Sequence, residues 1–208
     1  MRNLAILGAG GHGAVVADAA LAAGWQAVMF FDDAWPRVAS VGPWQVVGAT
    51  AQLVRDGARF DATVVAIGDS AVRLAKLRAL AAAGLVAASV VHPRAVVSRH
   101  AEVGAGSVVL AGAVINPFAR LGVGCIINTG ATVDHHCQLA DGVHVSPGAH
   151  LGGGVRVGEA GWIGIGASVI PGVIIGAGTT VGAGAAVVGD IGDGLTVVGV
   201  PARTQERR

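Results

Sequence analysis

A hydrophobic period of six residues constrains the fold of this chain more than any other feature. From Val91 to Val187 every sixth residue is aliphatic, in one unbroken phase. Four residues after each of these comes a small or compact residue, such as Ala95 or Cys137. An α-helix repeats about every 3.6 residues and a strand every two, so this period predicts a solenoid of short strands. We therefore expect a parallel β-helix of hexapeptide repeats, with three repeats in each coil.

The register of the repeat also predicts which side chains face the core. The aliphatic residue points inward on a flat side, and the small residue fits where the chain turns a corner. Glycine is frequent directly after the aliphatic residue, as at Gly104 and Gly122. We expect these glycines to supply the backbone freedom of the corners. Cys125 and Cys137 occupy the small position, so we expect inert core thiols there.

Composition narrows the classes of function. The 208 residues include 34 glycines, and 53% are hydrophobic but only 4% aromatic. The net charge of +1 gives no surface for nucleic acid, and the basic cluster is confined to the tail at 203–208. No uncharged run is long enough for a membrane span without turn-forming glycines. The N-terminal apolar run is too short for a signal peptide, so we expect a cytoplasmic protein.

The first 90 residues follow a different rule, in which strands alternate with helices. Apolar runs at 3–7, 27–31 and 63–67 alternate with helical stretches at 14–23 and 71–83. Such alternation predicts a parallel sheet of βαβ units, about half of a complete dinucleotide-binding domain. We therefore predict an α/β domain at residues 1–90. A β-helix domain with a C-terminal tail is predicted at residues 91–208.

A glycine-rich loop follows the first strand. Gly8, Gly10 and Gly13 form the pattern G-x-G-x-x-G, and the acidic pair Asp32-Asp33 follows the second strand. Bare backbone N–H groups at a helix N-terminus can approach phosphates closely. An NAD site is only weakly supported, because the second nucleotide-binding half and a dehydrogenase catalytic domain are both missing. A nucleotide diphosphate sugar suits the same geometry, and the structural alternative is a plain turn with solvated aspartates.

Charged and imidazole side chains are further candidates for binding phosphate or acting as a catalytic base. Arg73 and Lys76, on one predicted helix face, could reach a phosphate, although two such cations are usually solvated. His135 and His136 fall outside the inward positions of the repeat and are expected on the surface. Acyl transfer to an amine requires a base with a pKa near neutrality, an oxyanion donor and a coenzyme groove. Imidazole fits the base, although an exposed histidine can also be a bystander.

A metal site is not predicted. Some β-helix trimers hold zinc through a spaced trio of histidines from two subunits. The exposed set of His135, His136, His144 and His150 lacks that spacing. We therefore expect neither a metal nor a metal-dependent reaction.

Several motifs, in order, resemble one family. LGAGGHG, FFDD, AIGD, INTGATVDHHCQLADGVHVSPGAHLGGGV and VVGVPAR look like those of nucleotide-sugar N-acetyltransferases of bacterial glycan synthesis. That group includes the bacillosamine and perosamine N-acetyltransferases, with sialic acid O-acetyltransferases as a sister branch. The resemblance covers nearly the whole chain. It implies a left-handed β-helix, a homotrimer with acetyl-CoA bound between subunits, and acetylation of the 4-amino group of a nucleotide-linked amino-deoxysugar.

The resemblance also assigns binding residues. Those near the nucleotide sugar are Gly8, Gly10, Gly11 and His12 at the phosphates, Asp32 or Asp33 at the base or ribose, and Ile67 and Gly68 alongside. Those near the coenzyme are Gly153, Ile165, Ala183, Val200 and Pro201.

The catalytic residues are carried over in the same way. His135, seven residues after Asn128, matches the base, and Asn128 matches a supporting polar group. His144 matches a second active-site histidine, and the Gly153 N–H matches the oxyanion donor. The family usually has an acid directly after the base, where this chain has His136.

The departure leaves the orientation of His135 open. A neutral His136 could still accept a hydrogen bond, whereas a protonated one would lower the pKa of His135. Asp134 could substitute for the acid, but an extended backbone would point its side chain away.

Two alternatives to N-acetylation remain at this stage. One is an O-acetyltransferase acting on a sugar hydroxyl, and the other is a non-enzymatic nucleotide-sugar-binding protein. An amine is the better nucleophile and needs less help from a base, so the imperfect dyad favours N-acetylation.

Overall fold

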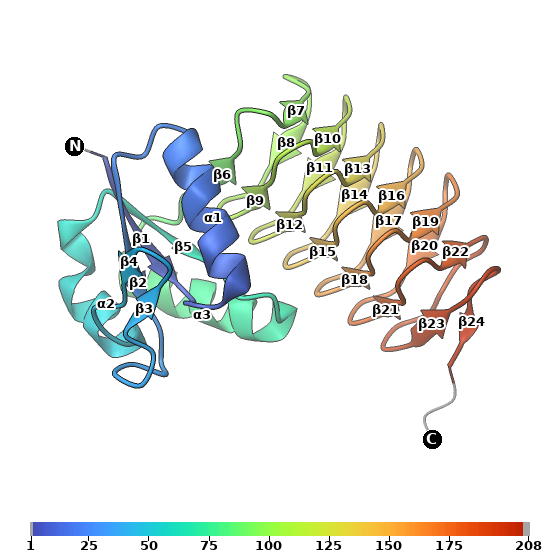
Figure 1. The fold of residues 1–208 in the computed structure, drawn as a ribbon. Coiled ribbons are helices and arrows are strands. Elements are labelled where there is room, and N and C mark those ends of the chain that lie inside the picture. The colour runs from blue at the N-terminus through green and yellow to red at the C-terminus, as the bar shows by residue number, and fades with distance from the viewer. Residues whose placement is uncertain (1, 206–208) are drawn as a thin grey trace.

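The computed structural model describes residues 2–205 and contains a small α/β domain followed by a β-solenoid (Figure 1). The α/β domain has a parallel sheet in the order β2–β1–β5. Its strands are β1 (Asn3–Leu7), β2 (Ala27–Phe31) and β5 (Ala62–Val65), and its helices are α1 (Gly11–Ala22), α2 (Thr50–Asp56), η1 (Gly57–Arg59) and α3 (Ser70–Ala82). Helix α1 packs on one face of the sheet, while α2 and α3 pack on the other. The predicted alternation of strands and helices is confirmed, but α2 and the hairpin β3 (Ser40–Val41) and β4 (Trp44–Gln45) were not predicted.

The solenoid begins at Val90 and stacks short strands into three sheets, here called faces A, B and C, which are parallel except for the last strand of face A. Face A contains β6 (Val90–Val91), β9 (Val108–Val109), β12 (Ile126–Ile127), β15 (His144–Val145), β18 (Trp162–Ile163) and β21 (Thr180–Val181), followed by β23 (Thr196–Val198) and β24 (Arg203–Thr204). Face B contains β7 (Val96–Val97), β10 (Val114–Ile115), β13 (Thr132–Val133), β16 (His150–Leu151), β19 (Ser168–Val169) and β22 (Ala186–Val187). Face C contains β8 (Glu102–Val103), β11 (Arg120–Leu121), β14 (Gln138–Leu139), β17 (Arg156–Val157) and β20 (Ile174–Ile175). The architecture is that of a left-handed β-helix, as predicted.

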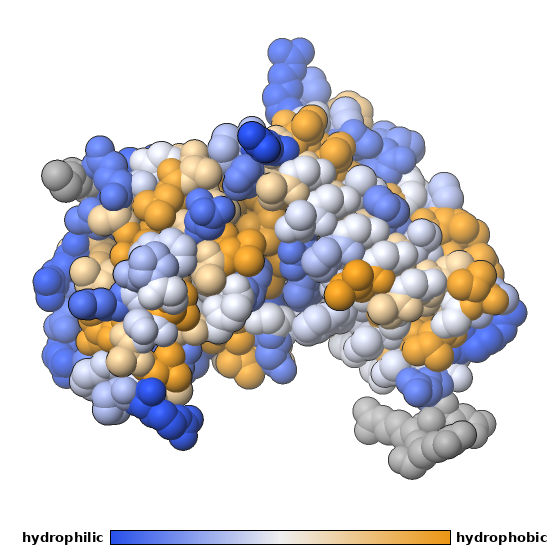
Figure 2. Space-filling view, viewed as in Figure 1, coloured by the Kyte–Doolittle hydropathy of each residue, from blue (hydrophilic) through white to orange (hydrophobic). Residues whose placement is uncertain are grey.

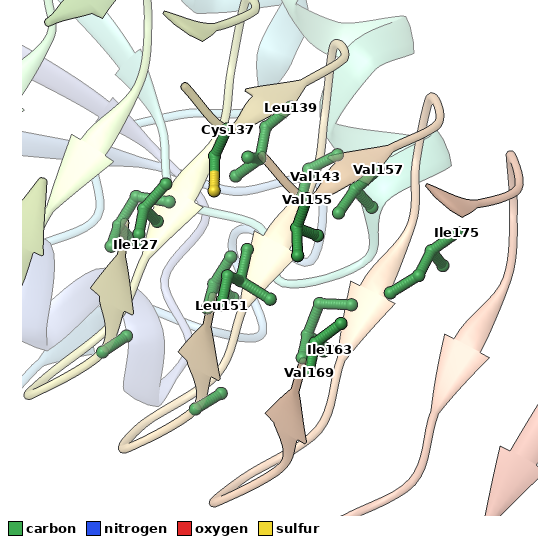
Figure 3. Packing of buried hydrophobic residues seen from close by; sticks show 14 of the residues in the cluster. Ile127, Cys137, Leu139, Val143, Leu151, Val155, Val157, Ile163, Val169 and Ile175 are labelled. Atoms are coloured by element: carbon green, nitrogen blue, oxygen red, sulfur yellow. The ribbon is translucent and has the colours of Figure 1, made fainter. Parts of the chain in front are cut away.

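The six-residue phase forms the core as expected. The aliphatic positions and the small corner positions make one continuous interior, in which side chains such as Leu151 and Ile163 point toward the axis of the coil (Figure 3). Cys125 and Cys137 are fully buried within it. Burial raises the pKa of the Cys125 thiol to about 12, so it stays protonated and unreactive.

The role predicted for the repeat glycines was partly wrong. The left-handed backbone angles occur at the fourth residue of the hexapeptide, as at Gly124 (φ 65°) and Gly142 (φ 69°). The glycine after the aliphatic residue instead lies against the next coil. A Cβ on Gly122 would lie 2.7 Å from the Asp141 nitrogen, so this glycine permits close stacking rather than turning.

Helix α3 docks the α/β domain on the corner between faces C and A. Leu74 and Leu77 lie over the corner glycines, and a Cβ on Gly142 would lie 2.7 Å from Leu74 Cδ1. On the same helix, the Arg78 guanidinium forms an exposed ion pair with Glu159, 3.1 Å away. Within residues 2–205, no helix has the length and apolar character needed to cross a membrane.

Candidate active site

The glycine loop packs closely against the end of β5 and exposes the start of α1. Gly8 has φ 116°, and a Cβ there would lie 2.7 Å from the Ala66 carbonyl oxygen. Gly10 and Gly11 are exposed, and a Cβ on either would meet no atom within 4 Å. The bare N-terminus of α1 is therefore open to an anion, as the sequence motif predicted.

The two aspartates after β2 have different environments. Asp32 accepts hydrogen bonds from the N–H groups of Ala9 (2.7 Å) and Ala34 (2.8 Å), so its carboxylate shapes the loop. Asp33 is exposed and pairs with Lys76 Nζ at 2.6 Å. The Lys76 hydrogen bond, aided by Thr50, lowers the pKa of Asp33 to about 2. Of the two, Asp33 is the carboxylate presented to solvent.

The second predicted histidine meets the glycine loop across the domain boundary. The rings of His12 and His144 lie 6.3 Å apart. His144 is on face A, where its Nε2 is 3.3 Å from the Asn128 amide nitrogen, and Trp162 on the next strand stacks on its ring at 4.5 Å. The structure thus brings His12 next to Asn128 and His144, which follow it in the sequence by more than a hundred positions.

Both histidines of this pair are held neutral. Burial, with the charge of Arg73 as the second cause, lowers the pKa of His12 to about 4 and that of His144 to about 3. His12 Nε2 and His144 Nδ1 are buried without a hydrogen-bond partner in the described part of the chain. A buried ring nitrogen without a partner is costly, so these atoms are candidates for binding a ligand.

The expectation that Arg73 is solvated was wrong. Its side chain is fully buried between α3 and the solenoid. The sequence gives no sign of this because the burial results from domain docking, whereas Lys76, three residues on, remains partly exposed in its pair with Asp33.

His135 and His136 lie on the corner between faces B and C, and both are exposed as predicted. Their Nδ1 atoms are 3.0 Å apart, with the rings nearly perpendicular at 84°. His136 has φ 58°, at a position where most coils have glycine, and its ring lies 5.0 Å from that of Phe118 in the coil below. The backbone conformation of His136 turns its ring toward His135.

Asp134 does not act on the imidazole of His135. Its Oδ1 accepts hydrogen bonds from the backbone N–H of His135 and from the Asn116 amide, both at 2.7 Å. These two bonds hold the pKa of Asp134 below its usual value. The carboxylate therefore fixes the corner backbone, and His136 is the side chain that contacts the His135 ring.

Gly153 lies directly above His135, in the next coil. A Cβ there would be 2.7 Å from His135 Nε2, so only glycine lets the ring rest in this place. In the coil below, the corresponding N–H, that of His135, is taken by Asp134. The residue before Gly153 is Gly152, which has no side chain to accept. No acceptor among residues 2–205 takes the Gly153 N–H, which leaves it available to an oxyanion.

The residues assigned to the coenzyme lie along other parts of the solenoid. Ile165 is 61% exposed, and Ala183 follows it one coil later on the corner between faces A and B. Val200, 76% exposed, and Pro201 lie in the turn between β23 and β24. Figure 2 shows apolar surface exposed over these C-terminal coils, which suits the apolar part of a pantetheine arm.

The predicted catalytic residues fall into two groups within one subunit. Asn128 and His144 lie on face A and its corner with face B, where His12 of helix α1 faces them from the α/β domain. His135, His136 and Gly153 lie on the corner between faces B and C, which is the prism corner opposite face A. The hydrophobic core of the solenoid separates the two groups.

Sequence reasoning missed several residues of these groups. Phe118 was detectable, because it breaks the run of fourth-position glycines just as His136 does. Trp162 and Asn116 gave no signal, since their roles depend on stacking between coils that are 18 residues apart. The described residues contain no group of three histidine, cysteine or acidic side chains able to hold a metal ion.

Comparisons with known proteins identify similar chains. A family model described as the PglD N-terminal domain matches residues 3–80. The chain is similar to the acetyltransferase domain of PglB from Neisseria gonorrhoeae FA1090 in complex with acetyl coenzyme A. The two share 44% identity over 98% of this chain and 99% of that one, with a TM-score of 0.94. A comparison with curated proteins finds no match.

Two further structures are similar over almost the whole chain. PerB from Caulobacter crescentus, in complex with CoA and GDP-perosamine, shares 40% identity over 99% of this chain and 98% of that one, with a TM-score of 0.93. WeeI from Acinetobacter baumannii AYE shares 26% identity over 99% of this chain and all of that one, with a TM-score of 0.88.

Proposed function

This chain belongs to the family of left-handed β-helix nucleotide-sugar N-acetyltransferases, and from that premise we propose the following substrate and mechanism. The enzyme is an acetyl-CoA-dependent acetyltransferase, and its acceptor is the 4-amino group of a nucleotide-linked amino-deoxysugar. The observation that carries the proposal is the His135 ring lying against Gly153, whose N–H has no hydrogen-bond acceptor among residues 2–205. A base and an oxyanion donor side by side are what direct attack on a thioester requires.

His135 acts as the base through Nε2. The amine attacks the thioester carbon, His135 takes the proton, and the Gly153 N–H holds the oxyanion. Collapse of the intermediate breaks the carbon–sulfur bond, and the proton passes to the departing thiolate of CoA.

His136 takes the place of the family acid. For Nε2 of His135 to be free, Nδ1 must carry the proton and donate it to His136 Nδ1, 3.0 Å away. A neutral His136 with its proton on Nε2 accepts that bond. The pair thus fixes the tautomer of the base without a carboxylate.

The complete site forms between two copies of the chain in a homotrimer. Because His135 is on the corner opposite face A, a nucleotide sugar held by His12 and His144 cannot reach the base of its own subunit. A neighbouring copy that places its B–C corner against this face A would complete the site. The apolar residues exposed on the C-terminal coils then line the coenzyme groove between subunits.

The nucleotide sugar binds the α/β domain, with its phosphates at Gly10 and Gly11. Asp33, the exposed aspartate, faces the base or ribose, while Asp32 supports the loop from behind. The buried nitrogens of His12 and His144 that lack partners lie where the diphosphate or sugar would arrive.

Thiol release from acetyl-CoA tests the proposal. A panel of UDP-, GDP- and dTDP-linked 4-amino-deoxysugars should give release with at least one member, and mass spectrometry should show an amide product. Acetylation of a hydroxyl instead would favour the O-acetyltransferase. Binding without thiol release would favour the non-enzymatic alternative.

His135→Ala tests the base. The substitution should lower kcat by a factor of about 10² to 10⁴, while the trimer and coenzyme binding stay intact. A rate close to that of the parent enzyme would rule out this assignment.

A further inference from the structure

Arg73 is a buried cation without an acidic partner. Its side chain is fully buried, and it forms no ion pair with a carboxylate of residues 2–205. Burial lowers its pKa to about 10, so it remains charged at neutral pH. A buried charge is costly unless hydrogen bonds replace its hydration. An apolar side chain would dock helix α3 at lower cost, so the charge calls for a further explanation.

One side of the guanidinium forms hydrogen bonds with the solenoid. Arg73 Nε donates to the Gly124 carbonyl at 2.8 Å, and Nη2 donates to the Gly142 carbonyl at 2.6 Å. The two acceptors are on successive coils at the C–A corner. From there the chain runs directly into Asn128 in one coil and His144 in the other.

The other side of the guanidinium forms hydrogen bonds with the edge of the proposed nucleotide-sugar site. Arg73 Nη1 donates to the carbonyls of Ile67 at 2.7 Å and Gly68 at 2.8 Å. These residues follow β5, next to the glycine loop. The planar fork therefore joins the Ile67–Gly68 segment to two successive coils of the solenoid at once.

We infer that Arg73 is a positioning residue for the transferase reaction, which fixes the Ile67–Gly68 edge of the substrate site to the coil that carries His144. The inference rests on the function proposed above. The position of the acceptor amine depends on how the α/β domain sits on the solenoid. A misplacement of about 1 Å can cost two orders of magnitude in rate, so a rigid link has a direct catalytic effect.

The charge of Arg73 has a second effect on the same residues. It is the second cause, after burial, of the lowered pKa of both His12 and His144. Both rings are therefore neutral at working pH, with a nitrogen free to bind substrate. The cation also adds a positive field at the place where the diphosphate would bind.

Arg73→Lys tests this role, with Arg78→Gln as the matched control. Lysine keeps the charge but cannot bond both coils and the Ile67–Gly68 edge together. We expect kcat/KM for the nucleotide sugar to fall about 10- to 100-fold, with KM for acetyl-CoA changed less than about twofold. Arg78→Gln removes an exposed interdomain contact of the same helix and should leave both parameters unchanged.

The outcomes separate the two proposals. If the parent enzyme releases no thiol with any nucleotide sugar, the proposed function fails. If the parent enzyme is active and Arg73→Lys folds with an unchanged kcat/KM, the positioning role is wrong. A fall in Tm and in the active fraction with unchanged KM values would show a merely structural contact.

A measurement on the parent enzyme decides the matter should Arg73→Lys not fold. The nucleoside diphosphate alone should slow hydrogen exchange at residues 67–68 and also at 124–128 and 142–146. Slower exchange confined to the α/β domain would overturn the inference.

Discussion

His136 occupies a backbone position that most coils give to glycine. A left-handed φ of 58° costs a histidine about 1 kcal/mol or more relative to glycine. Both side chains are exposed, so their contact adds little to stability. The cost of the left-handed backbone is therefore explained by function, because this conformation directs the His136 ring onto His135 Nδ1. The stacked ring of Phe118, which has the same unusual φ of 66°, supports it from below. In the proposed mechanism, His136 therefore orients the base although it is not an acid.

Two substitutions of His136 test whether the hydrogen bond that it accepts from His135 is what matters. His136→Asn tolerates the left-handed backbone and offers an oxygen to the His135 Nδ1–H. It should keep most of kcat, because the amide oxygen still accepts the His135 Nδ1–H and fixes the same tautomer of the base.

His136→Ala removes the acceptor and should lower kcat about 10- to 100-fold. The check is the kcat of all three enzymes measured at one pH. Equal kcat values in the parent enzyme and His136→Ala would show that His136 does not set the tautomer.

The B–C corner is the element that joins the proposed base and the proposed oxyanion donor, and its geometry depends on two successive glycines. Gly152 leaves the next N–H without a side-chain acceptor, and Gly153 leaves room for the His135 ring. Both effects need the register between coils, which places residue 153 one coil, or 18 residues, above His135.

Gly153→Ala tests this element without altering a functional group. Its φ is ordinary, so alanine fits the backbone, but the Cβ would lie 2.7 Å from His135 Nε2 and displace the ring. We expect kcat to fall about 10- to 100-fold, with little change in Tm. Gly189→Ala, at a site where a Cβ meets nothing within 4 Å, is the control and should behave like the parent enzyme. Equal rates in the two variants would show that contact with Gly153 does not position the His135 ring.

Features of the fold and site that depend on local sequence could be predicted, whereas features that depend on distant contacts could not. The six-residue phase placed Val133 and Cys137 inside and His135 outside, because the direction of a side chain depends only on its position in the repeat. The contact between the two imidazoles depends on one φ angle, which the repeat does not specify. The burial of Arg73 depends on how two domains dock, and no local pattern in α3 indicates that.

Protonation of the buried histidines links the whole fold to pH. His12 and His144 have a pKa of about 4 and about 3 in the folded chain, against an ordinary value of 6.5. Between these limits the unfolded chain binds more protons, so the free energy of unfolding falls as pH falls from about 6.5 toward 4. Each histidine contributes at most about 1.4 kcal/mol per pH unit. Urea unfolding at fixed protein concentration from pH 7.5 to 4.5 checks this, and His144→Gln should reduce the slope. A slope unchanged by that substitution would contradict the assignment.

Assembly of the active site from two copies of the chain can be tested by coexpressing two inactive variants. His12→Ala impairs the substrate side on face A, and His135→Ala removes the base on the opposite corner. In trimers formed randomly from equal amounts of the two variants, about a quarter of the sites between subunits receive both residues intact. Activity of the coexpressed mixture should therefore rise to about a quarter of the parent value, while each variant alone stays nearly inactive. If base and substrate site belonged to the same subunit, every site in the mixture would keep one defect. Activity would then stay near the sum of the separate variants, so the measured rate distinguishes the two arrangements directly.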